Sequence, residues 1–394
     1  MSPHRILIVH NAYQQSGGED RVVADEAALL ARRGHEVLEM RRDNHEVALT
    51  GRLRLAAETL WSRRTSREAR ELLRRFRPDV VHVHNTLPLV SPSLYWACAE
   101  AGVPVVQTLH NFRLACPQAM FLRDGAVCER CVGRLPWPAV RHGCYRDSHA
   151  QTAVVAGMLA LHRGLGTYRE KVTRYIALNE FCRAKFIEAG LPADRIMVKP
   201  NFAEIAPAGQ QDGARHGFLF VGRLSPEKGI ATLARAWDGR AGASLRVAGT
   251  GPAGGEIAER PGVAMLGALS QDSVQREMRA ALALVMPSIW YENFPRTLVE
   301  AFGVGLPVIA SRLGALAELV EDGVTGLLFA PGDPDALAER LRWAADNRQR
   351  MAWMGANARG RFEALYTPET NYARLIEIYE AAMADREATE ETHA

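Results

Sequence analysis

The stretch GFLFVGRLSPEKGIATLARAW (217–237) decides the fold. It opens with an apolar run typical of a buried strand, passes through a loop that holds Arg223 and Lys228, and ends in a helical pattern. The loop amides and both cations therefore stand at the start of a helix, where the macrodipole favours anions. We expect a strand, an anion-binding loop and a helix; the alternative is a solvent-exposed basic loop.

Short apolar runs alternate with helical patterns along the whole chain, which predicts parallel sheets. In the first half the runs are ILIVH (6–10), VVHVH (80–84), PVVQTLH (104–110) and YIALN (175–179), with a long helix over 21–34. In the second half they are GFLFVGRL (217–224), SLRVAGTG (244–251), VAMLG (263–267), ALVMPS (283–288), PVIAS (307–311) and GLLF (326–329). The pattern indicates two doubly wound, Rossmann-like α/β domains.

The length of 394 residues also favours two domains. The stretch 200–217 is rich in Pro, Gly and Ala and is interpreted as the linker. We therefore predict a first domain over 1–206, a second over 207–365, and a C-terminal helix and tail over 366–394 that return to the first domain. Since open α/β sheets bind ligands at the carboxyl ends of their strands, the chemistry is expected in a cleft between the domains.

Glu292 and Glu300 form the second half of the predicted site, in the stretch ENFPRTLVE (292–300). Pro295 is tolerated in the first turn of a helix, so residues 296–303 are predicted as the helix body. Two cations suit a leaving diphosphate, and two carboxylates suit sugar and ribose hydroxyls. The combination suggests glycosyl transfer, whereas the carboxylates alone would indicate a solvated helix face.

Several motifs resemble those of the retaining glycosyltransferases of family 4, whose fold is called GT-B. They are GRLSPEKG (222–229), VAGTGP (247–252), ENFPRTLVEA (292–301), GLPVIAS (305–311) and EDGVTGLLFAPGDPDALAE (321–339), followed more thinly by GGED (17–20) and TLHN (108–111). The resemblance implies that Arg223 and Lys228 bind the donor diphosphate, and that Glu300 holds the ribose. It implies that Glu292 holds the transferred sugar.

The same resemblance implies further substrate contacts, at Gly249, Gly251, Asn293, Phe294 and Pro295. Asn293 and Pro295 stand where glycine is often found in the family, so the contact to the sugar is expected to differ. In the first domain it implies that His110 lies beside the donor sugar. A histidine bonded to a loop carbonyl is the alternative there, and His82, His84 and Asn85 call for the same caution.

Gly17 and Gly18 follow the first predicted strand and precede a helix. Glycines there let the backbone approach a phosphate or sugar closely, although a simple strand-to-helix turn would look the same.

The resemblance also implies the reaction. The donor would be a UDP- or GDP-sugar, the acceptor a glycan or a polyprenyl-linked glycan of a bacterial surface polysaccharide, and the configuration would be retained by front-face attack without a catalytic metal or cofactor. A sugar-nucleotide epimerase and a non-catalytic binding subunit of the same fold are the alternatives. A phosphorylase fits poorly, because it needs a pyridoxal-bearing lysine and the chain has only Lys171, Lys185, Lys199 and Lys228.

Four cysteines follow His110 with the spacing C-x11-C-x2-C-x12-C, namely Cys116, Cys128, Cys131 and Cys144. This pattern predicts a structural zinc site that orders the loop 112–147, with unbound thiols or disulfides as the alternatives. Cys98 and Cys182 lie in apolar helical patterns and are predicted to be packing residues.

Residues 52–77 form a basic amphipathic stretch with nine arginines. It is predicted either to rest on an anionic membrane surface or to be a solvated helix. Nucleic-acid binding is not expected, because the net charge is only +3 and no recognition motif is present. The chain enters its first strand without a signal segment, so a cytoplasmic location is expected, at the inner face of the plasma membrane if the basic stretch binds lipid.

Overall fold

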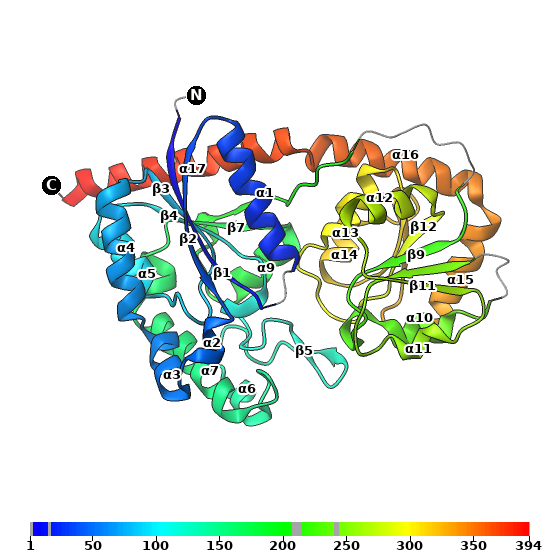
Figure 1. Cartoon of the computed structure of the whole chain (residues 1–394), viewed down its shortest axis with the longest axis horizontal. Helices are drawn as coiled ribbons and strands as arrows, with labels where there is room; N and C mark the ends of the chain where they lie inside the picture. Colours follow the sequence, from blue (N-terminus) through cyan, green and yellow to red (C-terminus); the bar gives the residue numbers. More distant parts are fainter. Residues whose placement is uncertain (1–2, 15–16, 207–214, 240–243, 394) are drawn as a thin grey trace. The chain divides into compact units, whose positions relative to one another are not determined.

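The computed structural model describes residues 3–14, 17–206, 215–239 and 244–393, which form two compact units (Figure 1). Unit 1 comprises the described residues up to Met120, then Glu129–Pro200 and the residues from Asn371 onward. Unit 2 comprises Phe121–Cys128 and the described part of Asn201–Thr370. The predicted boundary at residue 207 lies outside the described residues, as does the middle of the predicted linker, 207–214.

Unit 1 is built on a six-stranded sheet in the order β2-β1-β3-β4-β7-β8, and every pairing is parallel, as the alternating pattern predicts. The strands are β1 (Arg5–Ala12), β2 (Glu36–Asp43), β3 (Val80–Asn85), β4 (Val105–Thr108), β7 (Arg174–Ala177) and β8 (Ile196–Val198). The order reverses between β1 and β3, whose carboxyl ends therefore flank the crevice where doubly wound sheets bind ligands.

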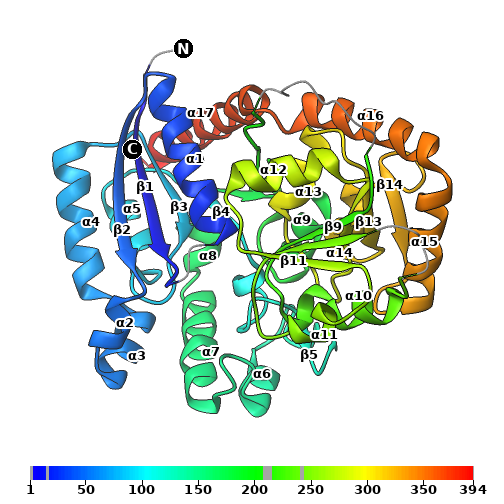
Figure 2. The same cartoon turned by 45° about the vertical axis from the view of Figure 1, so that its right-hand side comes forward.

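The connections of unit 1 are mostly helical. They are α1 (Gly18–Arg32), α2 (Glu46–Leu49), α3 (Arg52–Leu60), α4 (Arg63–Phe76), α5 (Ser93–Glu100), η1 (Phe112–Leu114), α6 (Trp137–His142), α7 (His149–Gly164), α8 (Thr167–Glu170), α9 (Glu180–Glu188) and η2 (Ala193–Arg195). The basic stretch is thus two helices rather than one, because Ser62 accepts a hydrogen bond from the Thr65 amide and begins α4 anew. Helices α3 and α6 both pack on α7 (Figures 1 and 2).

Unit 2 repeats the architecture with the parallel order β11-β10-β9-β12-β13-β14. Its strands are β9 (Phe218–Val221), β10 (Leu245–Ala248), β11 (Val263–Gly267), β12 (Ala283–Met286), β13 (Val308–Ser311) and β14 (Gly326–Phe329). Its helices are η3 (Pro226–Lys228), α10 (Ile230–Ala236), α11 (Gly255–Ala258), α12 (Gln271–Ala280), α13 (Arg296–Gly303), α14 (Gly314–Leu319), α15 (Pro334–Asp346) and α16 (Arg348–Leu365). The strand order reverses between β9 and β12.

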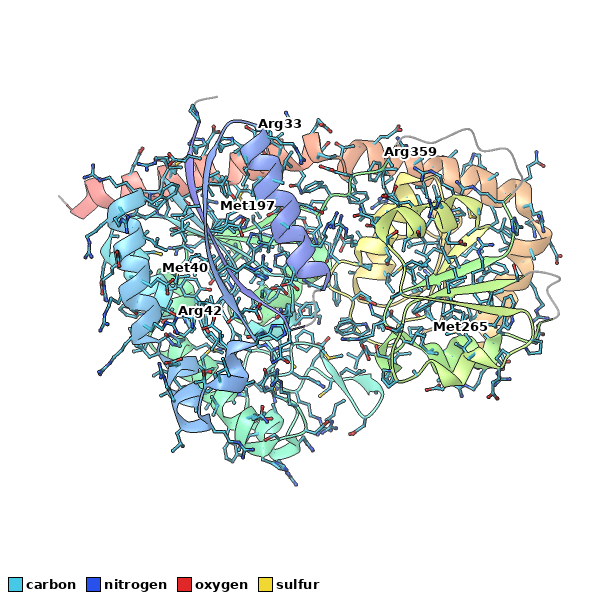
Figure 3. All side chains as sticks on the ribbon, in the orientation of Figure 1. Arg33, Met40, Arg42, Met197, Met265 and Arg359 are labelled. Carbon is cyan, nitrogen blue, oxygen red and sulfur yellow. The ribbon has the colours of Figure 1, made fainter. Side chains whose placement is uncertain are left out.

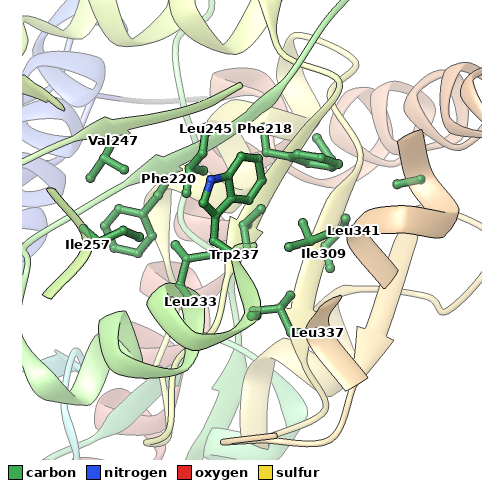
Figure 4. Packing of buried hydrophobic residues seen from close by; sticks show 14 of the residues in the cluster. Phe218, Phe220, Leu233, Trp237, Leu245, Val247, Ile257, Ile309, Leu337 and Leu341 are labelled. Atoms are coloured by element: carbon green, nitrogen blue, oxygen red, sulfur yellow. The ribbon is translucent and has the colours of Figure 1, made fainter. Parts of the chain in front are cut away.

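A cluster of buried apolar side chains fills one side of the unit 2 sheet (Figure 4). Trp237 stands at its centre, edge-on to Phe218 with ring centroids 6.0 Å apart, while its indole N–H donates to the Pro261 carbonyl at 2.7 Å. Leu337 and Leu341 from α15 close the cluster. This core fixes the strands whose carboxyl ends carry the candidate site.

The C-terminal helix α17 (Pro368–His393) belongs to unit 1 from Asn371 onward. Ile376 and Tyr379 pack with Ile6 and Ile8 of β1 in one buried cluster. Toward its far end, Asp385 accepts a hydrogen bond of 2.8 Å from Arg174 of β7.

The edge strands differ from the central ones in exposure. Met265 on β11 is 39% exposed, and Glu36 and Glu39 on β2 are exposed, whereas Met40, which follows Glu39, is buried (Figure 3). Within the described part of the chain, no helix combines the length and the apolar character that crossing a bilayer requires.

Candidate functional site

Two loops meet at the point where the strand order of unit 2 reverses. The first, Gly222–Gly229, follows β9, and the second, from Pro287 to Pro295, follows β12. The Ile289 amide donates to the Glu227 carbonyl at 3.0 Å and joins them. This is the position where an open α/β sheet binds its ligand.

Gly229 makes this junction possible. Its φ of +73° lies in the left-handed region, and a Cβ placed on it would stand 1.8 Å from the Pro287 carbonyl oxygen. Only glycine fits both requirements. Gly249 and Gly251 serve a similar purpose, because their Cβ atoms would stand 1.9 Å from the Gly222 oxygen and 2.3 Å from the Leu224 oxygen. Their packing role is therefore clear, and substrate contact at these two glycines stays a prediction.

Arg223 lies on the exposed side of the first loop, with 62% of its side chain accessible. Its Nη2 donates to Glu227 Oε1 at 2.6 Å, and the Ser225 hydroxyl donates to the same oxygen at 2.6 Å. Burial alone would raise the pKa of Glu227, but the hydrogen bonds from Ser225 and Arg223 hold it below its ordinary value. The guanidinium is thus held by one carboxylate and open to solvent.

Lys228 points across to the second loop. Its Nζ lies 2.7 Å from Glu292 Oε1, which also accepts a hydrogen bond from the Ser288 hydroxyl at 2.6 Å. The ammonium lies 5.5 Å from the centroid of the Trp290 ring. The resemblance assigned Lys228 to the donor diphosphate and Glu292 to the transferred sugar. In the structure the two side chains form an ion pair with each other.

Glu300 lies inside α13, which begins at Arg296 directly after Pro295, as predicted. Glu292 is 4% exposed and Glu300 is 6% exposed, so neither belongs to a solvated helix face. Arg296 Nε donates to Glu300 Oε1 at 3.0 Å. Asn293 and Phe294 are also buried beside the start of this helix, which has no side-chain cap.

In unit 1, His110 follows β4 and lies beside His84 of β3. His110 Nε2 and His84 Nδ1 are 2.8 Å apart, and the two rings stack. Burial, with smaller contributions from His10 and Lys199, lowers the pKa of His110 to about 3. The ring is therefore neutral at neutral pH. Its hydrogen bond runs to a histidine and not to a loop carbonyl.

Gly17 is the N-cap residue of α1, and its amide donates to Asp20 at 2.9 Å. Asp20 also contacts His10 Nε2 at 2.9 Å and accepts from the Tyr13 amide at 3.2 Å. Burial would raise the pKa of Asp20, but these hydrogen bonds hold it below its usual value. Among the residues that the structure describes, none has an atom within 4 Å of a Cβ built on Gly18, so these residues leave space for a ligand beside its backbone.

Glu19 is a candidate that sequence reasoning missed, although it lies in the GGED motif. Its Oε2 accepts hydrogen bonds from the Tyr13 hydroxyl at 3.0 Å and from Asn111 Nδ2 at 3.3 Å. Burial, only partly offset by His10 and these hydrogen bonds, raises the pKa of Glu19 to about 7. A carboxyl group that titrates near neutral pH is typical of functional sites.

The four cysteines do not form the predicted metal site. Among the described residues, no three of Cys116, Cys128, Cys131 and Cys144 bring their sulfur atoms within 4.8 Å of one another, and a zinc site needs all of its ligands on one ion. The segment is held by other means. Phe112 and Phe121 are buried, and Arg163 donates to the carbonyls of Leu114 and Arg134 at 2.5 and 2.8 Å. Cys98 and Cys182 are fully buried, as a packing role requires.

Solved structures of low sequence identity share the fold. The Rickettsia africae glycosyltransferase gives a TM-score of 0.70 at 15% identity, over 97% of this chain and 99% of that one. Anabaena HepE in complex with UDP-glucose gives a TM-score of 0.65 at 20% identity, over 96% of this chain and 100% of the other. The fold of the chain is therefore GT-B, with two Rossmann-like domains.

Sequence comparison gives the family. The model described as Glycosyltransferase Family 4 matches residues 16–206, and the model described as Glycosyl transferases group 1 matches residues 215–347. The D-inositol 3-phosphate glycosyltransferase of Streptomyces scabiei is 35% identical over 334 residues, which cover 78% of this chain and 69% of that protein. The chain belongs to glycosyltransferase family 4.

Proposed function

We propose that the chain transfers a sugar from a UDP- or GDP-sugar, with retention of configuration and without a catalytic metal ion. The observation that carries this proposal is that Arg223 and Lys228 both lie in the loop after β9, at the point where the strand order of unit 2 reverses. Two fixed cations and the uncapped start of α13 provide positive charge where a diphosphate would bind. A metal ion would add charge that these groups already supply.

The ion pairs suggest how the donor engages the site. A diphosphate carries more negative charge than one carboxylate, so it draws the ammonium of Lys228 away from Glu292 and the guanidinium of Arg223 away from Glu227. Glu292 then has a carboxylate oxygen available for a sugar hydroxyl, and Glu300 serves the ribose. Donor binding and sugar positioning are coupled through one exchange of partners.

In the proposed reaction, the bond between the anomeric carbon and the leaving phosphate oxygen breaks as the acceptor oxygen attacks from the same face. The departing phosphate takes the acceptor proton, while Arg223 and Lys228 stabilise its developing charge. His110, Gly17 and Gly18 of unit 1 are proposed to contact the transferred sugar.

The acceptor is proposed to be a polyprenyl-linked glycan. A groove of about 590 Å³ in unit 1 supports this, because its apolar lining is accompanied by two basic side chains. It is lined by parts of α2, α3 and α7 and by the segment after β3, including Val47, Leu53, Leu55, Ala56, Leu87, Pro88, Val154 and Val155, together with Arg52 and Arg146. An isoprenoid chain suits the apolar lining, and its diphosphate suits the arginines.

The surface next to the groove has the composition of a surface that binds an anionic membrane. Leu49 and Leu53 are 89% and 90% exposed. Arg63 and Arg67 lie on α4, and neither forms an ion pair among the described residues, although several other arginines of the stretch do. Exposed leucines and uncompensated arginines are typical of an interfacial contact. We propose that the enzyme acts at the cytoplasmic face of the plasma membrane in surface polysaccharide biosynthesis.

The experiment is a donor panel. UDP-, GDP- and ADP-sugars are tested by calorimetry and for slow donor hydrolysis, in EDTA and then with added Mg²⁺. We expect one nucleotide sugar to bind and to be hydrolysed equally well under both conditions. Binding by no member of the panel would overturn the proposal, and interconversion of the donor without release of nucleotide would favour an epimerase instead.

A further inference from the structure

A chain of buried polar side chains lies beneath His110 in unit 1. Lys199, which follows β8, donates from Nζ to Glu26 Oε1 of α1 at 2.5 Å, and both side chains are fully buried. Asn371 accepts a second hydrogen bond from the same ammonium at 3.3 Å. The Glu26 carboxylate is therefore held in place by a buried cation.

The second oxygen of Glu26 faces a histidine. Among the described residues, Glu26 Oε2 has no hydrogen-bond partner, and neither does His84 Nε2, which lies 3.7 Å away. Both atoms are buried, so an arrangement in which the carboxylate oxygen faces a nitrogen lone pair would raise the free energy of the folded state.

His84 also contacts His110, through its other ring nitrogen. The 2.8 Å hydrogen bond between His84 Nδ1 and His110 Nε2 needs one proton, which either ring can supply. Burial lowers the pKa of both histidines, so each ring is neutral and carries a single proton. Only two arrangements of the pair are then available.

In the first arrangement His84 carries its proton on Nδ1, and the lone pair on its Nε2 points at the Glu26 carboxylate. In the second, the proton of His84 is on Nε2 and faces the carboxylate, while Nδ1 accepts from His110 Nε2–H. The first places two regions of negative charge 3.7 Å apart in a buried site. The second replaces that repulsion with attraction, and electrostatics in a buried site is strong enough to decide between tautomers.

We propose that Glu26, acting through His84, fixes His110 in the tautomer that carries its proton on Nε2 and a lone pair on Nδ1. In this form His110 Nδ1 is a hydrogen-bond acceptor for a substrate hydroxyl. Glu26 and His84 are positioning residues, and Lys199 holds the Glu26 carboxylate in place through the buried ion pair. The role toward a sugar hydroxyl rests on the proposed function, whereas the tautomer does not.

The same cluster does not fit a metal ion. Glu26, His82 and His84 offer three ligand-type atoms within 4.8 Å, but the ammonium of Lys199 sits on the same carboxylate. The Tyr379 hydroxyl and Thr108 already engage both ring nitrogens of His82, each at 2.8 Å. A divalent cation would be repelled by the buried ammonium of Lys199, and both ring nitrogens of His82 are already engaged in hydrogen bonds.

The test is ¹⁵N-histidine NMR of the ligand-free protein, in which long-range correlations distinguish protonated from unprotonated ring nitrogens. His110→Gln assigns the His110 signals by their loss. We expect a protonated Nε2 and an unprotonated Nδ1 on His110, with a preference of about tenfold or more over the other tautomer. A His110 ring protonated on Nδ1 would overturn the proposal, whatever the donor proves to be.

Variants add a second readout. Glu26→Gln leaves Lys199 unpaired, so it is compared with the double variant Glu26→Gln/Lys199→Met, which removes the buried charge as well. In both, we expect the tautomer preference of His110 to be lost, and the KM for the donor sugar to rise while the affinity for the bare nucleoside diphosphate is unchanged. An unaltered His110 spectrum in both variants contradicts the proposal. Exposed Glu39→Gln on β2 is the matched control.

Discussion

The ammonium of Lys228 lies 2.7 Å from the Glu292 carboxylate, although the two residues are 64 positions apart. They meet because β9 and β12 are neighbours at the reversal of strand order, so the loops after them share one edge of the sheet. The pair holds two groups of the proposed donor site in place before any donor binds. In the proposed exchange of partners, the donor diphosphate binds the ammonium of Lys228, and the Glu292 carboxylate is then released to bind the sugar.

Lys228→Met is expected to lower kcat/KM for the donor by about 10²- to 10³-fold, the usual cost of removing one fixed charge that stabilises a leaving group. Steady-state kinetics with the donor found in the panel measures this change.

Glu292→Gln should instead leave the affinity for the bare nucleoside diphosphate equal or tighter, because Lys228 no longer has a competing carboxylate. Lys171→Met in unit 1 is the control, and weaker diphosphate binding by Glu292→Gln would contradict the proposed exchange of partners.

Gly229→Ala is expected to unfold at a lower temperature and to lose donor binding. The left-handed conformation costs a non-glycine residue about 1–2 kcal/mol, and the collision with the Pro287 carbonyl oxygen adds to this cost. Thermal unfolding and calorimetry measure the two effects. A Cβ on Gly255, at the start of α11, would meet no atom of the described residues within 4 Å, so Gly255→Ala should behave like the unchanged protein. Equal behaviour of the two variants would show that the loop junction is not rigid.

The strands predicted from apolar runs are those with neighbours on both sides or apolar side chains on both faces. Strand β2 was missed because its sequence EVLEMRRD interrupts the apolar residues with charges, as an edge strand paired only to β1 tolerates. Strand β8 was missed because it has three residues. Helix α1 begins three residues before the predicted start, at Gly18, since Asp20 binds the Gly17 amide.

Residue types in the site could be predicted from the sequence, but their partners could not. Arg223 and Lys228 were identified from one contiguous loop, because a strand, a basic turn and a helix are adjacent in the chain. The contacts of Glu26 with Lys199 and of Glu19 with Asn111 join segments 173 and 92 positions apart. Local patterns carry no information on such distances. The zinc site predicted from the cysteine spacing has the same weakness, because the spacing along the chain does not show how far apart the sulfur atoms are in the folded protein.

Leu53→Ser is expected to weaken binding of farnesyl diphosphate to the groove of unit 1 by about tenfold or more, since burying a leucine side chain contributes about 1.5–3 kcal/mol. Calorimetry with farnesyl diphosphate, farnesol and inorganic diphosphate separates the contribution of the chain from that of the head group. Leu365→Ser is the control, because Leu365 is a similar exposed leucine of unit 2, with 41% exposure. Binding of inorganic diphosphate as tight as that of farnesyl diphosphate would exclude a lipid groove.

Arg163→Met is expected to loosen the segment around Leu114 and Arg134, because its guanidinium donates to the carbonyls of both residues. Hydrogen exchange of the amides in 112–135 measures this. Cys128→Ser should leave the exchange unchanged, and the exposed Arg169→Met serves as the arginine control. If Cys128→Ser loosened the segment as much as Arg163→Met, the cysteines and not Arg163 would hold it.

Glu19 should make the protein less stable as the pH rises. Burial raises its pKa from 4.5 to about 7, so the folded state holds a proton that the unfolded state releases between these values. The stabilising contribution is complete below pH 4.5 and is lost as the pH passes through 7. Glu19→Gln removes the titration, and at pH 8 we expect it to be more stable than the unchanged protein by up to about 3 kcal/mol, at about 1.4 kcal/mol for each pKa unit. At pH 4 the two should be equally stable. Denaturant unfolding at several pH values measures the difference, with Glu39→Gln as the surface control, and parallel curves for Glu19→Gln and the unchanged protein would show that Glu19 titrates normally.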